Sequence, residues 1–144
     1  MAVRSSFKLG NPHSELFPLQ PLVSACEGLL TGARSDCLIY GDVQGNPDLR
    51  QEILTQFGSY YGDCKPQELL LTYGITEAIT LTARSLLQQD DIVIVEAPTY
   101  HWALPEFRAQ GAKVIQIPVD KEGLRVDLLE LELERATRSG ARVK

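Results

Sequence analysis

The 144-residue chain carries a formal net charge of −5, and 44% of its residues are hydrophobic against 23% charged, which is typical of one soluble globular domain. This acidic balance offers no basic surface for nucleic acid or for an anionic membrane, and no apolar run approaches the ~20 residues of a transmembrane helix. The opening segment MAVRSSFKLG lacks the apolar core of a signal peptide, so we expect a cytoplasmic protein.

Cysteine and histidine are too sparse for a metal site. Cys26, Cys37 and Cys64 form no CxxC pair, and His13 and His101 are the only histidines in the chain. Zinc sites and disulfide frameworks need denser and more regular spacing. We therefore predict incidental or buried thiols and no bound metal.

The N-terminal part should be an arm followed by two helices. Residues 1–18 contain Gly10-Asn11-Pro12 and Phe17-Pro18, which favour turns and extended chain. A helix is predicted over Leu19–Leu30, with an apolar face of Leu22, Cys26, Leu29 and Leu30. After a loop over Asp36–Gly45, Asn46 is a plausible N-cap and Pro47 a first helical residue. The second helix should reach about Tyr61 and bury Leu49, Ile53, Phe57 and Tyr60.

The central stretch has the pattern of strand, tight turn, helix and strand. Leu69–Leu71 is a short apolar run before Tyr73-Gly74, a helix is predicted over Ile75–Leu87, and Ile92–Val95 is β-branched throughout, as in a strand buried on both faces. A glycine between a strand and a helix start leaves several N–H groups unpaired and facing one space, which suits an anion such as phosphate. An ordinary connection in an α/β domain has the same pattern, and the turn by itself does not decide between them.

The remaining segments complete an α/β pattern. We predict a helix over Ala103–Gln110, a strand over Lys113–Ile117, a turn at Asp120–Gly123 and an amphipathic helix over Val126–Arg138. With Leu69–Leu71 and Ile92–Val95, this gives three mainly parallel strands joined by helices.

An aromatic loop, Pro98-Thr99-Tyr100-His101-Trp102, follows the strand Ile92–Val95. Successive parallel strands end at the same edge of a sheet, where ligands bind. A phosphate site after one strand and an aromatic loop after the next indicate a planar ring that bears a phosphate.

Taken together, the chain resembles the N-terminal part of a class I/II, fold-type I aminotransferase that depends on pyridoxal phosphate. Four segments carry the resemblance in the family's order: YGDVQGNPDLR (Tyr40–Arg50), LLLTYGITEAI (Leu69–Ile79), DIVIVEAPTYHWAL (Asp91–Leu104) and GAKVIQIPVDKEGL (Gly111–Leu124). The resemblance implies a three-layer αβα large domain with an N-terminal arm. Residues 19–144 would form an incomplete large domain, without the C-terminal half and the small domain.

The resemblance also implies roles for individual residues. Gly74, Ile75 and Thr76 would surround the cofactor phosphate, with Ile75 offering only its N–H where many relatives add a hydroxyl. We expect Glu77 to face away from a dianionic phosphate. Tyr100 would stack on the pyridine ring, with Trp102 as the competing candidate and His101 as an ordinary loop histidine.

Three further roles concern the N-terminal half. The resemblance implies that the Tyr40 hydroxyl reaches the cofactor phosphate of a neighbouring subunit in a homodimer. Gly10, before Glu15-Leu16-Phe17-Pro18, would lie beside the substrate, where a side chain would crowd it. Arg50 is interpreted as structural.

The residues that perform the chemistry in this family follow the last matched segment. The family's Schiff-base lysine has no counterpart among Lys8, Lys65, Lys113, Lys121 and Lys144, so no catalytic residue is expected in this chain and we expect it to be inactive by itself. Three hypotheses remain: part of an enzyme that transfers an amino group between an amino acid and a 2-oxo acid, part of a transcription regulator with an aminotransferase-like effector domain, or a non-catalytic module that binds a full-length subunit.

Overall fold

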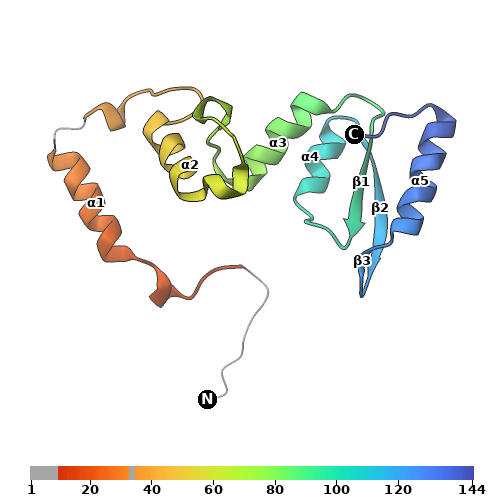
Figure 1. Cartoon of the computed structure of the whole chain (residues 1–144), viewed down its shortest axis with the longest axis horizontal. Helices are drawn as coiled ribbons and strands as arrows, with labels where there is room; N and C mark the ends of the chain where they lie inside the picture. Colours follow the sequence, from red (N-terminus) through yellow and green to blue (C-terminus); the bar gives the residue numbers. More distant parts are fainter. Residues whose placement is uncertain (1–9, 33–34) are drawn as a thin grey trace, which may run out of the picture. The chain divides into compact units, whose positions relative to one another are not determined.

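The computed structural model describes residues 10–32 and 35–144, and these belong to two units whose boundary lies between Pro66 and Gln67. Each unit is considered by itself (Figure 1). Among the described residues, no helix combines the length and the apolarity needed to cross a membrane.

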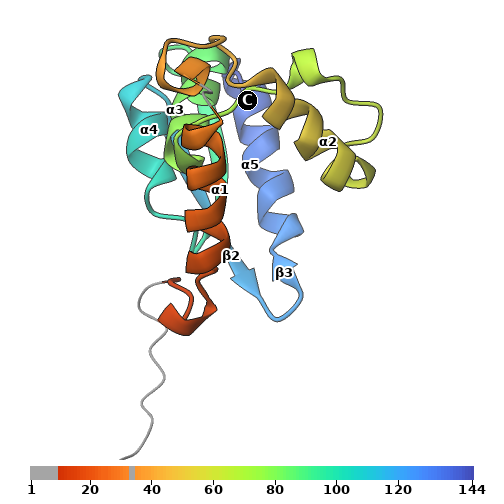
Figure 2. The ribbon, with the colours of Figure 1, turned by 90° about the vertical axis from the view of Figure 1, so that its left-hand side faces the viewer.

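The first unit is helical. It contains a 3-10 helix at Ser14–Leu16, α1 at Leu19–Thr31, a second 3-10 helix at Ser35–Leu38 and α2 at Pro47–Tyr61 (Figure 2). The predicted start of α2 is confirmed, because the Asn46 side chain accepts the N–H of Leu49 at 3.0 Å and Pro47 is the first helical residue.

The predicted apolar cores of these two helices are wrong. In α2, Leu49, Phe57 and Tyr60 are 49%, 49% and 83% exposed, and only Ile53 is half-buried. The predicted face of α1 is likewise exposed, and α1 has no buried residue. Helical periodicity selects a face, but burial needs a second element against that face, and among the described residues the first unit has no strand.

The second unit is the α/β domain. It consists of α3 at Gly74–Leu86, β1 at Ile92–Ala97, α4 at Ala103–Ala109, β2 at Lys113–Asp120, β3 at Gly123–Leu124 and α5 at Val126–Ser139. A 3-10 helix, Pro66–Glu68, lies where the two units join. In Figure 1, α4 and α5 lie on opposite sides of the sheet, so the layers are helix, sheet and helix. The α/β fold class is therefore confirmed.

The sheet has the order β1-β2-β3. β1 and β2 are parallel, in register from Ile92 opposite Lys113 to Ala97 opposite Pro118, whereas β3 turns back antiparallel to β2. On its other edge β1 is joined at one point, a parallel bridge between Ile92 and Val143. The core is small, and its buried apolar residues are Ala83, Ile92, Val93, Ala103, Ala112, Ile117 and Ala136.

The strand predicted at Leu69–Leu71 is wrong. The segment is not paired in a sheet with any described residue, although Leu70 is exposed while Leu69 and Leu71 are half-buried, as alternate residues of an extended chain would be. An extended segment becomes a strand only when another strand supplies its hydrogen-bond partners. The third strand of the sheet is β3, the short return of a hairpin.

Candidate functional site

The turn before α3 has a backbone conformation that favours glycine. Gly74 has φ +79°, in the region that side chains disfavour, and a Cβ placed on it would meet no atom within 4 Å. The Gly74 N–H donates to the Thr72 carbonyl oxygen at 2.9 Å, and the Thr72 hydroxyl donates to the Gly74 carbonyl oxygen at 3.1 Å. The turn is therefore closed on itself, with open space beside the Gly74 Cα.

Two backbone donors remain at the start of the helix. Ile75 and Thr76 are exposed, and their N–H groups donate to no atom within residues 10–32 and 35–144. They belong to the first turn of a 13-residue helix, whose dipole favours an anion at this end. We name the segment Gly74–Thr76 the cradle. Its geometry suits a phosphate group that approaches the glycine closely.

The position of Glu77 differs from the expectation that it faces away. Its carboxylate accepts the N–H of Tyr73, the residue that precedes the helix. The side chain thus folds back to the start of α3 and places a negative charge near the cradle. Repulsion by a phosphate would turn this carboxylate away, but an unpaired N–H at a helix start attracts a nearby carboxylate.

The aromatic loop lies between β1 and α4. The chain leaves β1 at Ala97, the Ala97–Pro98 peptide bond is cis, and the Tyr100 carbonyl oxygen accepts the N–H of Ala103 at 3.1 Å. Tyr100 is 47% exposed and Trp102 is 58% exposed. The His101 ring lies near both, with centroids 6.0 Å from Tyr100 and 4.8 Å from Trp102.

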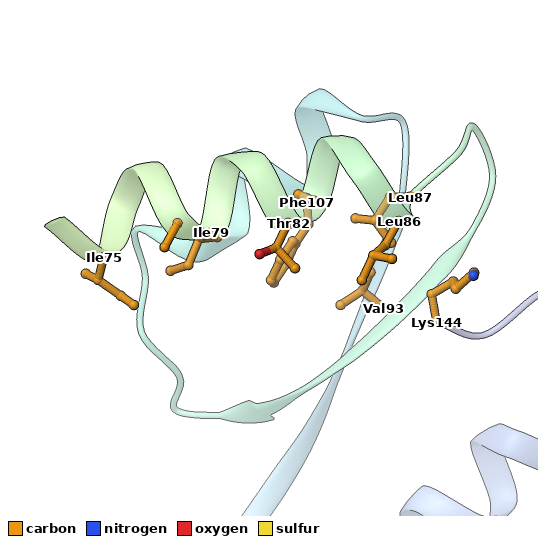
Figure 3. A pocket seen from close by; sticks show the side chains of 10 residues that line it. Ile75, Ile79, Thr82, Leu86, Leu87, Val93, Phe107 and Lys144 are labelled. Carbon is orange, nitrogen blue, oxygen red and sulfur yellow. The ribbon is translucent and has the colours of Figure 1, made fainter. Parts of the chain in front are cut away.

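One hydrogen bond links the cradle helix to the helix that follows this loop. The Thr80 hydroxyl donates to the Glu106 carboxylate at 2.8 Å, joining the first half of α3 to the first turn of α4. Figures 1 and 3 show the chain after β1 running toward the N-terminal end of α3, where Ile75 lies. The structure therefore places the cradle and the Tyr100 loop toward the same end of α3 and α4.

An open apolar groove runs along one face of α3, from Ile75 to Leu87 (Figure 3). Its volume is about 370 Å³, and it is lined by Ile75, Ala78, Ile79, Thr82, Ala83, Leu86, Leu87, Val93, Phe107 and Lys144. Leu86 is 55% exposed in this groove, because no described residue covers this side of the helix. Ile75 lines the groove with its side chain, whereas Gly74, Thr76 and Tyr100 do not, so the groove meets the candidate phosphate site only at Ile75.

The other predicted site residues lie in the first unit, not with the cradle. Gly10 is exposed, and a Cβ on it would meet nothing within 4 Å. The Tyr40 side chain is fully exposed. The structure therefore brings the cradle and Tyr100 together in one unit, whereas Gly10 and Tyr40 belong to the other.

The Tyr40 loop is anchored by a residue whose partners the sequence did not reveal. Arg50 is 5% exposed, and its guanidinium donates to the Gln44 side chain at 3.1 Å, to the Pro66 carbonyl oxygen at 2.9 Å and to the Asp42 carboxylate at 3.3 Å. The Asp42 side chain also accepts the N–H of Gln44 at 2.8 Å. These contacts support the interpretation of Arg50 as structural.

The layered α/β unit has a glycine turn before one helix and an aromatic loop after the next strand. These features define a class of proteins that bind a phosphorylated planar cofactor. The comparisons identify the family within that class. The family model "Aminotransferase class I and II" matches residues 11–144, and the chain belongs to this family. This match confirms the resemblance drawn from the sequence, and the cofactor of the family is pyridoxal phosphate.

Three relatives illustrate the match. Aromatic-amino-acid aminotransferase 1 from Thermococcus litoralis is 32% identical over 136 residues, which are 94% of this chain and 33% of that protein. LysN, an alpha-aminoadipate aminotransferase from Thermus thermophilus solved with N-(5'-phosphopyridoxyl)-L-leucine, superposes with a TM-score of 0.77 at 32% identity, covering 88% of this chain and 31% of that one. The uncharacterized HTH-type transcriptional regulator YdcR from Escherichia coli is 32% identical over 124 residues, covering 85% of this chain and 26% of that protein. The chain spans about a third or less of the length of these relatives.

Proposed function

We propose that this chain is the N-terminal, cofactor-binding part of an aminotransferase that moves an amino group between an amino acid and a 2-oxo acid. The observation that carries the proposal is the cradle: in a chain of this family, Ile75 and Thr76 present two N–H groups beside Gly74 that no described residue accepts. Bound pyridoxal phosphate supplies the electron sink for amino-group transfer, while the protein supplies binding and orientation.

Different residues of the second unit bind the phosphate and the pyridine ring of the cofactor. The Ile75 and Thr76 N–H groups and the Thr76 hydroxyl donate to the phosphate, and the missing side chain of Gly74 leaves room for it. The Tyr100 ring, half exposed at the end of the sheet, packs on the pyridine ring. The bond between Thr80 and Glu106 holds the two contact regions at one end of the helices.

The first unit contributes to binding across a homodimer in the cytoplasm. The exposed Tyr40 ring, on a loop anchored by Arg50, is available to reach the phosphate site of a second subunit. Gly10, within the N-terminal arm, leaves room for the substrate.

The chain by itself is proposed to be inactive. Lys113 pairs with Asp90 at 2.9 Å, and Lys121 is exposed beside Glu122. Neither lies in the cradle or in the aromatic loop, so neither is suited to hold the cofactor covalently.

A second candidate function has a specific observation behind it. The similarity to YdcR supports a chain that forms part of the aminotransferase-like domain of a transcription regulator. The same cradle would then bind the cofactor as an effector. The nucleotide sequence upstream of codon 1 distinguishes the two candidates, because a regulator requires an encoded DNA-binding domain there. The third hypothesis, a module that binds a full-length subunit, predicts a stable complex with such a subunit in size-exclusion chromatography.

The cofactor proposal is tested by titrating the isotope-labelled chain with pyridoxal phosphate and, separately, with pyridoxal. We expect pyridoxal phosphate to shift the amide resonances of Ile75, Thr76 and Tyr100, and pyridoxal to leave those of Ile75 and Thr76 in place. Equal shifts with both compounds, or none at the cradle, would overturn it.

A further inference from the structure

At the start of α3, some backbone N–H groups have an acceptor in the described part of the chain and others do not. A helix start leaves its first N–H groups without partners inside the helix. Here the Tyr73 N–H donates to the Glu77 carboxylate and the Gly74 N–H donates to the Thr72 carbonyl oxygen. Acceptors among the described residues therefore satisfy the N–H groups of Tyr73 and Gly74 and leave those of Ile75 and Thr76 without a partner.

We propose that Glu77 is a positioning residue of the cradle. By holding the Tyr73 N–H, its carboxylate keeps the turn at Thr72–Gly74 closed and leaves the next two N–H groups directed at the phosphate. The inference rests on the proposed function, because it concerns the same phosphate site.

Two effects of Glu77 on a bound phosphate oppose each other. Its hydrogen bond pre-organises the turn, which lowers the entropy lost when the anion binds. Its negative charge, in the same helical turn, repels the anion. A glutamine at this position keeps a hydrogen-bond acceptor and removes the charge, whereas an alanine removes both, so the two substitutions separate the effects.

The alternatives to positioning make different predictions. If Glu77 acted through its charge alone, Glu77→Ala and Glu77→Gln would strengthen phosphate binding equally. If it only stabilised the helix, neither substitution would change the affinity of the folded chain. Positioning predicts that Glu77→Ala weakens binding and that Glu77→Gln does not.

The experiment is an NMR titration of the full chain with inorganic phosphate, following the amide resonances of Ile75 and Thr76. We expect Glu77→Ala to raise the dissociation constant roughly three- to tenfold, the equivalent of one ordinary hydrogen bond, and Glu77→Gln to leave it equal or lower. Glu130→Ala and Glu130→Gln, at an exposed carboxylate on α5, are matched controls for net charge and should change nothing.

The outcomes separate this inference from the proposed function. If phosphate shifts the two resonances in the wild-type chain and Glu77→Ala binds as tightly or more tightly, the positioning role is overturned and the phosphate site stands. If the two resonances move in no variant, the phosphate site and the positioning role both fail. Should Glu77→Ala not fold, Glu77→Asp decides: its carboxylate is one methylene shorter, so it should weaken binding, and an unchanged dissociation constant overturns the proposal.

Discussion

Arg142 and Asp91 are joined by two parallel hydrogen bonds, from Nε at 2.6 Å and from Nη2 at 2.7 Å, one to each carboxylate oxygen. The Asp91 carboxylate is almost fully buried and also accepts the N–H of Gln88 at 2.7 Å. Next to this ion pair, the Ile92 N–H donates to the Arg142 carbonyl oxygen, and the Lys144 N–H donates to the Ile92 carbonyl oxygen. The pair thus fastens the C-terminal residues to the start of β1.

This pair predicts a pH dependence of stability. The hydrogen bonds from Arg142 hold the pKa of Asp91 below its ordinary value of 3.8, against the opposing effect of burial. Because the pKa is lower in the folded state, the stabilisation is complete above the ordinary carboxyl pKa and is lost as the pH falls through the folded value. We expect Asp91→Asn to lower the melting temperature by several degrees at neutral pH and to flatten its decline in acid.

Thermal melts between neutral pH and about pH 2, followed by circular dichroism, measure this effect. Asp90→Asn is the control, since its carboxylate pairs with Lys113 on the surface and contributes little. An Asp91→Asn chain with the wild-type pH profile would show that the pair does not stabilise the fold.

Gly74→Ala should reduce phosphate binding through the space that the new methyl group occupies. The substitution also strains the backbone, because φ is +79°, at a cost of about 1–2 kcal/mol. Gly140→Ala is the matched control: Gly140 has φ +71°, with no atom within 4 Å of an added Cβ, and follows α5. Chemical denaturation should show similar losses of stability, whereas the phosphate titration should weaken only for Gly74→Ala.

Arg50→Lys should loosen the Tyr40 loop. Lysine keeps the charge but cannot direct several donors in a fixed plane, so contacts to Asp42, Gln44 and Pro66 cannot all be kept. We expect a loss of about 1–3 kcal/mol in unfolding free energy and faster amide exchange at Gln44 and Gly45, measured by NMR. Arg84→Lys, at an exposed position on α3, should leave both quantities unchanged. Unaltered exchange in Arg50→Lys would contradict the anchoring role.

Tyr100→Ala should weaken the affinity for pyridoxal phosphate more than His101→Ala does. Loss of an aromatic contact predicts a two- to tenfold change, on the order of 0.5–1.5 kcal/mol. Equilibrium dialysis of the chain against the cofactor measures it. Trp102→Ala tests the competing candidate, and a larger effect there than at Tyr100 would show that the wrong ring was assigned.

Pyridoxal phosphate followed by borohydride should label no single lysine. Lys113 and Lys121 pair with Asp90 and Glu122 outside the cradle, so we expect them to react weakly and without preference. Peptide mass spectrometry locates any label. A dominant adduct on one lysine would contradict the proposed inactivity of the isolated chain.

The features predicted correctly from the sequence depend on neighbouring residues. The cap of α2 needs only Asn46 and Pro47, and β1 needs only its run of β-branched residues. The glycine turn before α3 and the loop with Tyr100 were located in the same way, because glycine and proline determine turns locally.

The features predicted wrongly depend on distant partners. Within the part of the chain that the structure describes, the segment Leu69–Leu71 has the composition of a strand but no neighbour to pair with. Likewise Leu49, Phe57 and Tyr60 have helical spacing but no described element that covers them. Glu77 was misplaced for a related reason: its position is decided by the Tyr73 N–H, whose need for an acceptor appears only once the helix start is known. The arrangement of Asp42 and Gln44 around Arg50 has no signature in the sequence.

The parallel bridge between Ile92 and Val143 lies on the edge of β1 that β2 does not cover. β1 is hydrogen-bonded along its full length to β2 on one edge, while among the described residues its other edge is paired at Ile92 alone. Direction and register on that edge are therefore already fixed for any strand that extends the pairing. The backbone N–H and C=O groups further along this edge can also pair with a strand of a neighbouring molecule. High protein concentration therefore favours association through this edge.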